Sequence, residues 1–498
     1  MKPATIEECV RDYIDAERAQ IPVPVAVASR ILHAVEVSRP TPRRPRLAFM
    51  RLAASFVIVL LIGVGIAWMR TAQMPAGTES GTWSSAASMA VPRAYHTATL
   101  LPNGKVLVVG GRGLSAVSAP WQRPVSAISS AELYDPKTRT WSSAGKLNIA
   151  RFAHTATLLA NGKVLIVGGN QTPPNGNLPT GADPVSSVEL YDPQTNSWSL
   201  AASMLTARAL HTATLLHDGR VLVAGGTESS SDDPSIELAS AELYDPAANT
   251  WMAAPPMASV RANHSATLLS DHRVLVIGGT DRLLDYPTGT APVAGLNTAE
   301  FFDPTTDSWS PAPSMGYTRI SPSITLLPNG SVLVVGDYGV NEQTAEIYDP
   351  ALGRWSASPQ PLAGHAGHLA VLLHSGAVLI AGGLGDASAE LFNWHRDTWA
   401  SAGTLATMRS GATATVLTNG QVLLAGGYGR GSSAMAGAEL YDPQGTYEVG
   451  IARRSLAPVL EGWVAPLLAV FAVLLAVGLW LLARRRARQS EAGVIWLD

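Results

Sequence analysis

Two short stretches decide the fold: residues 151–170, RFAHTATLLANGKVLIVGGN, and residues 186–198, SSVELYDPQTNSW. The runs HTATLL and KVLIVGG predict two short β-strands joined at Asn161-Gly162, a dipeptide that suits the left-handed turn of a two-residue hairpin. SVELYDP predicts a third strand that stops at Pro193, and a fourth begins at Trp198. A single four-stranded antiparallel unit of this size cannot bury its own faces, so we expect further copies of it.

The chain contains seven such units. A glycine doublet closes the second strand at Gly110-Gly111, Gly168-Gly169, Gly225-Gly226, Gly278-Gly279, Gly382-Gly383 and Gly426-Gly427, and Gly336-Asp337 fills the remaining place. The third-strand motif begins at Ala131, Val188, Ala241, Ala299, Ala345, Ala389 and Ala438. Its tyrosines include Tyr134, Tyr191 and Tyr244, and the tryptophan column is Trp83, Trp141, Trp198, Trp251, Trp309, Trp355 and Trp399. Sevenfold recurrence predicts sheets packed face to face around an axis.

These motifs resemble the Kelch repeat, in which a glycine doublet after the second strand is followed by a spaced Tyr and Trp. The resemblance covers residues 83–447. It implies an all-β, seven-bladed Kelch-type β-propeller. It implies little about chemistry, because the fold carries both binding modules and a few enzymes.

The two ends of the repeat array are complementary. Trp83 opens a fourth-strand pattern that lacks its own first three strands, whereas no Trp follows Tyr441 in the last repeat. We therefore expect the N-terminal strand to complete the seventh blade and close the ring. In the alternative, Tyr447 supplies that fourth strand itself.

Two apolar segments, 47–69 and 463–483, flank the repeats, and each is long enough, or nearly so, to cross a bilayer as a helix. Arginines precede the first and follow the second, which predicts that both ends are cytoplasmic and that the propeller lies outside the cell membrane. Alternatively, the first segment is a cleaved secretory signal or the second is a removed sorting tail, and either would still export the propeller. Residues 1–46 predict two short helices, residues 70–82 and 448–462 are linkers, and residues 484–498 form a basic tail.

Charge and cysteine content exclude two classes of function. Thirteen of the 35 basic and eight of the 38 acidic residues lie in 1–51 and 484–498, which leaves the rest with a net charge of about −8. An acidic propeller offers no basic surface for nucleic acid. The only cysteine is Cys9, so the propeller can form neither a disulfide nor the Tyr–Cys copper cofactor of galactose oxidase, an enzyme that some Kelch-type propellers resemble.

Three columns of polar residues recur in register. Histidines stand at His96, His154, His211, His264 and His368, and arginines stand three residues earlier in six blades, from Arg93 to Arg409. Positions repeated around a seven-bladed channel are too far apart to converge on one metal ion. We therefore expect these side chains to bond backbone within or between blades. The glutamates of the third strand are also scaffold, because a catalytic acid is needed once and not seven times.

Function should lie where the repeat is broken. The loop after the second strand is long in four blades, at Arg112–Ser129, Asn170–Ser187, Thr227–Ser240 and Thr280–Thr298, and builds up one side of one face. Candidate ligand-binding residues there are Arg112, Trp121, Arg123, Asp232, Asp233, Asp281, Arg282, Asp285 and Tyr286. In the alternative, these loops are solvated spacers.

We predict a membrane-tethered binding module for a protein or glycan, with no catalytic residues, metal or cofactor. One alternative is a carbohydrate-active enzyme that uses paired loop carboxylates such as Asp232-Asp233. Another is transmembrane signalling through residues 1–46.

Overall fold

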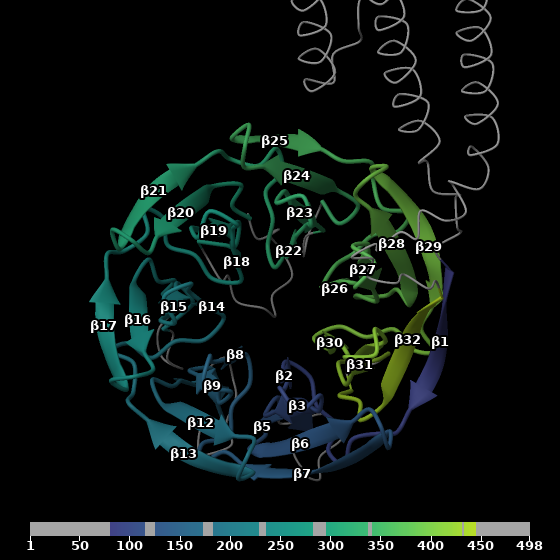
Figure 1. Ribbon diagram of the computed structural model, residues 1–498, viewed down its shortest axis with the longest axis horizontal. Coiled ribbons are helices and arrows are strands. Elements are labelled where there is room, and N and C mark those ends of the chain that lie inside the picture. Colours follow the sequence, from purple (N-terminus) through teal and green to yellow (C-terminus); the bar gives the residue numbers. More distant parts are fainter. Residues whose placement is uncertain are drawn as a thin grey trace, which may run out of the picture. The chain divides into compact units, whose positions relative to one another are not determined.

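The protein forms a ring of seven antiparallel sheets (Figure 1), which confirms the predicted all-β seven-bladed propeller. The structure, a computed structural model, describes residues 80–114, 125–172, 183–228, 236–281, 295–336, 341–430 and 433–444. The predicted helices of 1–46, both apolar segments, the C-terminal linker and the basic tail lie outside these residues. Within the described ranges, no helix is long and apolar enough to span a bilayer.

Each blade has four strands, which follow one another from the axis to the rim. Blade 1 contains β2 (Thr97–Leu100), β3 (Val106–Val109), β6 (Ser130–Asp135) and β7 (Thr140–Lys146). Blade 2 contains β8 (Thr155–Leu158), β9 (Val164–Val167), β12 (Val188–Asp192) and β13 (Ser197–Ala201). Blade 3 contains β14 (Thr212–Leu215), β15 (Val221–Ala224), β16 (Ala241–Asp245) and β17 (Thr250–Ala254). Blades 4 and 5 contain β18 (Ser265–Leu268), β19 (Val274–Ile277), β20 (Ala299–Asp303), β21 (Ser308–Ala312); and β22 (Ser323–Leu326), β23 (Val332–Val335), β24 (Ala345–Asp349), β25 (Arg354–Ala357). Blades 6 and 7 contain β26 (Leu369–Leu372), β27 (Val378–Ala381), β28 (Ser388–Asn393), β29 (Thr398–Thr404); and β30 (Thr413–Val416), β31 (Val422–Ala425), β32 (Ala438–Gln444), β1 (Ser80–Ala86).

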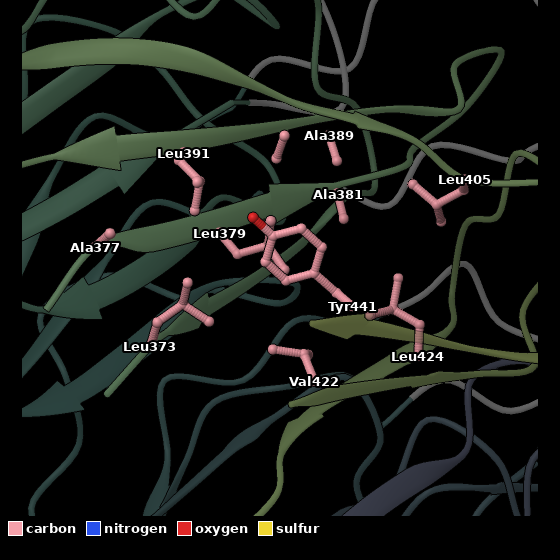
Figure 2. Close-up of a cluster of buried hydrophobic side chains, with 11 residues drawn as sticks. Leu373, Ala377, Leu379, Ala381, Ala389, Leu391, Leu405, Val422, Leu424 and Tyr441 are labelled. Carbon is pink, nitrogen blue, oxygen red and sulfur yellow. The ribbon is translucent and has the colours of Figure 1, made fainter. Parts of the chain in front are cut away.

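The core lies between neighbouring blades. Every residue of each second strand, such as β9, is buried, because both faces of the sheet are covered by adjacent sheets. Figure 2 shows one such cluster, in which Tyr441 of β32 lies among Leu379 of β27, Leu391 of β28 and Leu424 of β31. The apolar contacts therefore join blade 6 to blade 7, and equivalent clusters join the other neighbours.

The ring closes through its first described strand. β1 pairs with β32 over seven residue pairs, and Trp83 stands opposite Tyr441 with ring centroids 4.9 Å apart. The indole N–H of Trp83 donates to the carbonyl of Ala402 in blade 6 at 2.8 Å. The predicted closure is confirmed, and the alternative with Tyr447 as fourth strand is wrong because β1 occupies that position. β1 starts at Ser80, three residues before the predicted boundary of the propeller.

The turn at Asn161-Gly162 differs from the prediction. Gly162 is left-handed, with φ +81°, but Asn161 is not, and a two-residue type I′ turn needs positive φ at both positions. The Gly162 N–H donates to Leu159 at 2.9 Å, and the Leu159 N–H donates to Lys163 at 2.9 Å. The hairpin therefore has a three-residue loop ending in a left-handed glycine. The hydrogen bond between Leu159 and Lys163 extends the strand pairing by one residue and holds Leu159 in the core.

Two short ladders lie beside the blades at the bases of long loops. β4 (Arg112–Leu114) pairs with β5 (Val125–Ala127), and β10 (Asn170–Gln171) pairs with β11 (Asp183–Pro184). In the third and fourth blades, single bridges take their place, at Thr227 with Glu237 and at Thr280 with Gly295. The bases of all four predicted long loops are thus paired, by short ladders in two blades and by single bridges in the other two.

Candidate functional site

Buried ion pairs fix the glycine doublets. In blade 2, Arg151 Nη2 lies 3.1 Å from Glu189 Oε1 with both side chains fully buried, and Nη1 donates to the carbonyls of Gly168 and Ser187 at 2.8 and 2.9 Å. Burial lowers the pKa of Arg151, and the charge of Glu189 opposes that shift. The other ion pairs are Arg93–Glu132, Arg208–Glu242, Arg261–Glu300, Arg319–Glu346 and Arg409–Glu439. In blade 6, His365 Nε2 takes the place of the guanidinium and lies 3.0 Å from Glu390 Oε1. The predicted scaffold role of both columns is confirmed, although the sequence did not predict that they pair with each other.

The histidine column joins neighbouring blades through side chains. His154 Nε2 lies 2.9 Å from Thr97 Oγ1 of the preceding blade. The same contact occurs at His211–Thr155, His264–Thr212, His368–Ser323 and His96–Thr413. The predicted bonding partner was therefore wrong for this nitrogen, which contacts a hydroxyl rather than backbone. The sequence did not reveal it because the hydroxyl lies one blade earlier, more than forty residues away.

These histidines are neutral in the fold. Burial, followed by the charge of the nearby arginine, lowers the pKa of His96 and of His264 to about 3. Within the described ranges, no group of three or more His, Cys, Asp or Glu side chains is placed to hold a metal ion.

A ring of left-handed residues surrounds the axis where each blade begins. Tyr95, Ala153, Leu210, Asn263, Ser321, Gly367 and Gly411 all have φ between 50° and 62°. The Tyr95 N–H donates to Gly411 at 2.7 Å, the Ala153 N–H to Tyr95 at 3.0 Å, and this pattern continues to Ser321. Left-handed φ costs a non-glycine residue roughly 1–2 kcal/mol, so the ring is strained and stiff. We call it the axial ring.

The axial ring and the long loops belong to one face. In five blades the residue after the glycine doublet pairs with the residue just before the axial-ring residue, as in Ala94 with Arg112, Phe152 with Asn170 and Ser410 with Tyr428. The predicted site residue Arg112 lies on this face next to the ring. Asp281 is exposed on the same face but in blade 4, so the structure does not bring it to Arg112. The remaining candidates, Trp121, Arg123, Asp232, Asp233, Arg282, Asp285 and Tyr286, lie outside the described residues.

Arg112 belongs to a cluster that spans blades 7, 1 and 2. Its guanidinium carbon lies 5.4 Å from the centroid of the Phe152 ring, and Tyr95 contacts Tyr428 edge-on at 5.8 Å. Burial raises the pKa of Tyr428, and the positive charge of Arg112 opposes this shift. We call Tyr95, Arg112, Phe152 and Tyr428 the Tyr–Arg cluster. It places two hydroxyls, a cation and aromatic surface beside the axis.

Sequence reasoning found only Arg112 in this cluster. A usable signal existed for Tyr95 and Phe152, because they occupy repeat positions at which most blades carry small or short polar residues. It did not exist for Tyr428, since the position that it shares with Arg112 is also large in two other blades, at Tyr338 and Leu384. At the position of Tyr95 the other blades have Ala153, Leu210, Asn263, Ser321, Gly367 and Gly411. Large residues at repeat positions in or next to the axial ring therefore indicate that the sevenfold symmetry is broken there for a reason other than packing.

These observations define the molecule as a seven-bladed β-propeller with one built-up face. The Kelch motif matches residues 92–148, 151–205, 208–258 and 261–316. Four of the seven blades thus match the Kelch motif.

Known proteins share these repeats. Kelch-like protein 25 of Xenopus tropicalis is 30% identical over 48% of this chain and 36% of its own length. Alpha-scruin of Limulus polyphemus is 26% identical over 49% of this chain and 25% of its own length. The chain therefore spans about a third or less of these curated relatives. A copper-bound fungal alcohol oxidase of the AA5 family is structurally similar, with a TM-score of 0.56 over 73% of this chain and 76% of that chain, but at 16% identity it shows the fold alone.

Proposed function

We propose that this propeller is a binding module whose ligand, a protein or a glycan, contacts the face built from the long loops and the axial ring. The observation that carries this proposal is the Tyr–Arg cluster, in which Tyr95 and Phe152 replace the small residues that most other blades carry and lie beside Arg112 and Tyr428. Residues that the fold requires recur in every blade, whereas these do not. A rigid ring that carries one irregular patch is how repeat scaffolds present binding surfaces.

The long loops supply a direct test, provided that their paired bases are kept. Removing all of Thr227–Ser240 would delete Leu238, which is buried and bonds Gly226 and Arg261, and Ser240, which bonds Arg208. A narrower change is better. The Glu228 N–H donates to the Ile236 carbonyl at 3.0 Å, so residues 229–235 can be replaced by Asn-Gly across an existing hairpin.

Full-length protein and this variant would be used as bait against the native host extract, with bound protein and glycan both analysed. We expect the variant to melt at the same temperature as the parent and to lose retention of its ligand at least about tenfold. The same Asn-Gly hairpin in place of residues 173–182 tests the loop of blade 2. Undiminished capture by both variants would refute a ligand on the long-loop face.

We further propose that the propeller is tethered outside the cell membrane by the apolar segments 47–69 and 463–483, with residues 1–46 and 484–498 in the cytoplasm. The uncharged runs 52–69 and 463–483 within these segments and the arginines at their outer ends support this topology. Protease added to intact cells should release propeller fragments while an epitope tag at either terminus stays protected. Cleavage of the tags with an intact propeller would invert the topology and refute it.

A further inference from the structure

The strongest remaining feature is the Tyr–Arg cluster, whose polar tips bond none of the residues that the structure describes. The side-chain nitrogens of Arg112 make no hydrogen bond among the described residues, and its Nε is buried without a partner. The Tyr95 and Tyr428 hydroxyls likewise make none with the residues that the structure describes. Leaving donors unsatisfied in a half-buried setting costs free energy, so such groups point to a ligand that completes them.

The cluster is rigid before any ligand arrives. Tyr95 is held in the left-handed region at φ 51°, and Gly411 leaves the space beneath its ring, since a Cβ at Gly411 would lie 3.2 Å from the Tyr95 ring. Phe152 supports the Arg112 guanidinium from below. The Tyr95 side chain is nonetheless 37% exposed. An aromatic ring and a planar cation are thus presented to solvent in fixed positions, which lowers the entropy cost of binding.

The backbone around the cluster is already fully used. The Ala94 and Arg112 N–H groups bond each other's carbonyls at 3.0 and 2.6 Å, and the Ser410 and Tyr428 N–H groups do the same at 3.1 and 2.7 Å. The Tyr95 N–H and C=O are bonded within the axial ring. A peptide would gain affinity here by main-chain pairing, and none is offered. A ligand at this place must be recognised by ring faces, hydroxyls and charge alone.

We propose that the Tyr–Arg cluster is a saccharide subsite that takes a sugar carrying a carboxylate. This inference rests on the binding function proposed above and names its ligand. The apolar C–H face of a pyranose packs on the exposed Tyr95 ring, the two tyrosine hydroxyls bond sugar hydroxyls, and the Arg112 guanidinium pairs with the carboxylate, a planar acceptor that matches its fork. Arg112 has no acidic partner among the described residues, so its charge is available to the ligand.

The test uses substitutions that other blades already carry, so that folding is preserved. Tyr95→Asn copies Asn263, which tolerates the same left-handed φ, and Arg112→Thr copies Thr227 and Thr280 at the equivalent position. Tyr317→Ala is the matched control, because Tyr317 is 39% exposed but lies in the link to blade 5, outside the cluster. Each full-length variant would be titrated calorimetrically with an oligogalacturonate, a neutral galactose oligomer of the same length, and an acidic peptide of equal charge.

We expect the parent and Tyr317→Ala to bind the oligogalacturonate at least about tenfold tighter than the neutral oligomer, and Tyr95→Asn to lose about tenfold or more of that affinity. Arg112→Thr should abolish the preference for the charged sugar while leaving some affinity for the neutral one. Absence of saccharide binding by the parent, unchanged affinity in both variants, or peptide binding that depends on Arg112 would each overturn the inference. If both variants keep their affinity, or if a peptide binds through Arg112, the proposed binding function can still hold. Loss of ligand capture on replacing residues 229–235 with Asn-Gly would then support it.

Discussion

At the residue scale, the buried ion pairs should dominate stability. Replacing Arg151 with Met leaves the fully buried Glu189 without its ion-pair partner, although the backbone N–H groups of Asn148 and Ile149 and the side-chain amide of Asn148 still donate to it. Breaking a buried pair from one side typically costs about 3–5 kcal/mol of unfolding free energy. We expect a loss of that size by chemical denaturation.

The exposed pair in the same blade is the control. Lys163 Nζ lies 3.2 Å from Asp192 Oδ2, and the Lys163 side chain is 40% exposed. Because water screens such a pair, Lys163→Met should cost about 1 kcal/mol or less. Equal losses in the two variants would contradict a special role for the buried arginines.

The histidine contacts make stability depend on pH. His264 has a folded pKa of about 3 against an ordinary value of 6.5, chiefly because it is buried. Between these values the unfolded chain binds a proton that the folded chain does not, so stability falls as pH falls from about 6.5 towards 3. The double variant Thr212→Leu with His264→Ala, which copies Leu369 and Ala412, removes this group.

We expect the unfolding free energy of the double variant to fall less steeply with pH than that of the parent, by about 1.4 kcal/mol per pH unit between pH 6 and 4. The slope is the readout, because the variant also changes packing at neutral pH. Denaturation curves at four pH values suffice. Parallel slopes would show that His264 titrates normally in the fold.

At the element scale, the sequence predicted the strands well because each third strand ends at an Asp-Pro or its equivalent and each second strand is a continuous apolar run. It also predicted that Trp83 belongs to the last blade, since the missing Trp after Tyr441 is visible in the repeat alignment. It failed at the Asn161-Gly162 turn, where the dipeptide alone does not reveal that Leu159 remains paired. It also failed for Phe152, whose role depends on Arg112 of another blade. Contacts between blades have no local sequence signal.

β1 is the only strand of its blade that comes from the other end of the described array, so its loss should open the ring. Replacing residues 82–84 with Gly-Pro-Gly prevents pairing with β32 and exposes the outer edge of that strand. We expect a lower melting temperature and self-association by size-exclusion chromatography. The same replacement at residues 197–199 in β13 is the control, because that strand is connected to its neighbours on both sides. A control variant that is damaged as much as the β1 variant would contradict closure by β1.

At the scale of the whole molecule, the seven contacts between the first strands of neighbouring blades, which we call joints, are unequal. Five use a histidine and a hydroxyl, and the joint between blades 4 and 5 replaces this with Ser265 Oγ donating to the carbonyl of Pro322 at 2.5 Å. The joint between blades 6 and 7 has Leu369 and Ala412 at these positions and no such bond among the described residues. The histidine and the hydroxyl are thus both missing at the blade 6–7 joint, whereas at the blade 4–5 joint only the histidine is missing and Ser265 bonds backbone instead. A hydroxyl without a histidine can therefore bond backbone, but a buried histidine without an opposite hydroxyl would leave its Nε2 unsatisfied.

Restoring the missing joint should therefore need both changes. At the five histidine joints the ring packs against the first glycine of the preceding doublet, whereas the atoms nearest to a Cβ at Gly382 all belong to Arg409. In the double variant Leu369→Thr with Ala412→His, the new hydrogen bond should offset the cost of burying its two partners and contribute about 1 kcal/mol. Ala412→His alone buries an imidazole opposite Leu369 and should lose about 1–3 kcal/mol. A double-mutant cycle of melting curves measures the coupling between the two positions, and a coupling energy near zero would mean that the two losses are independent.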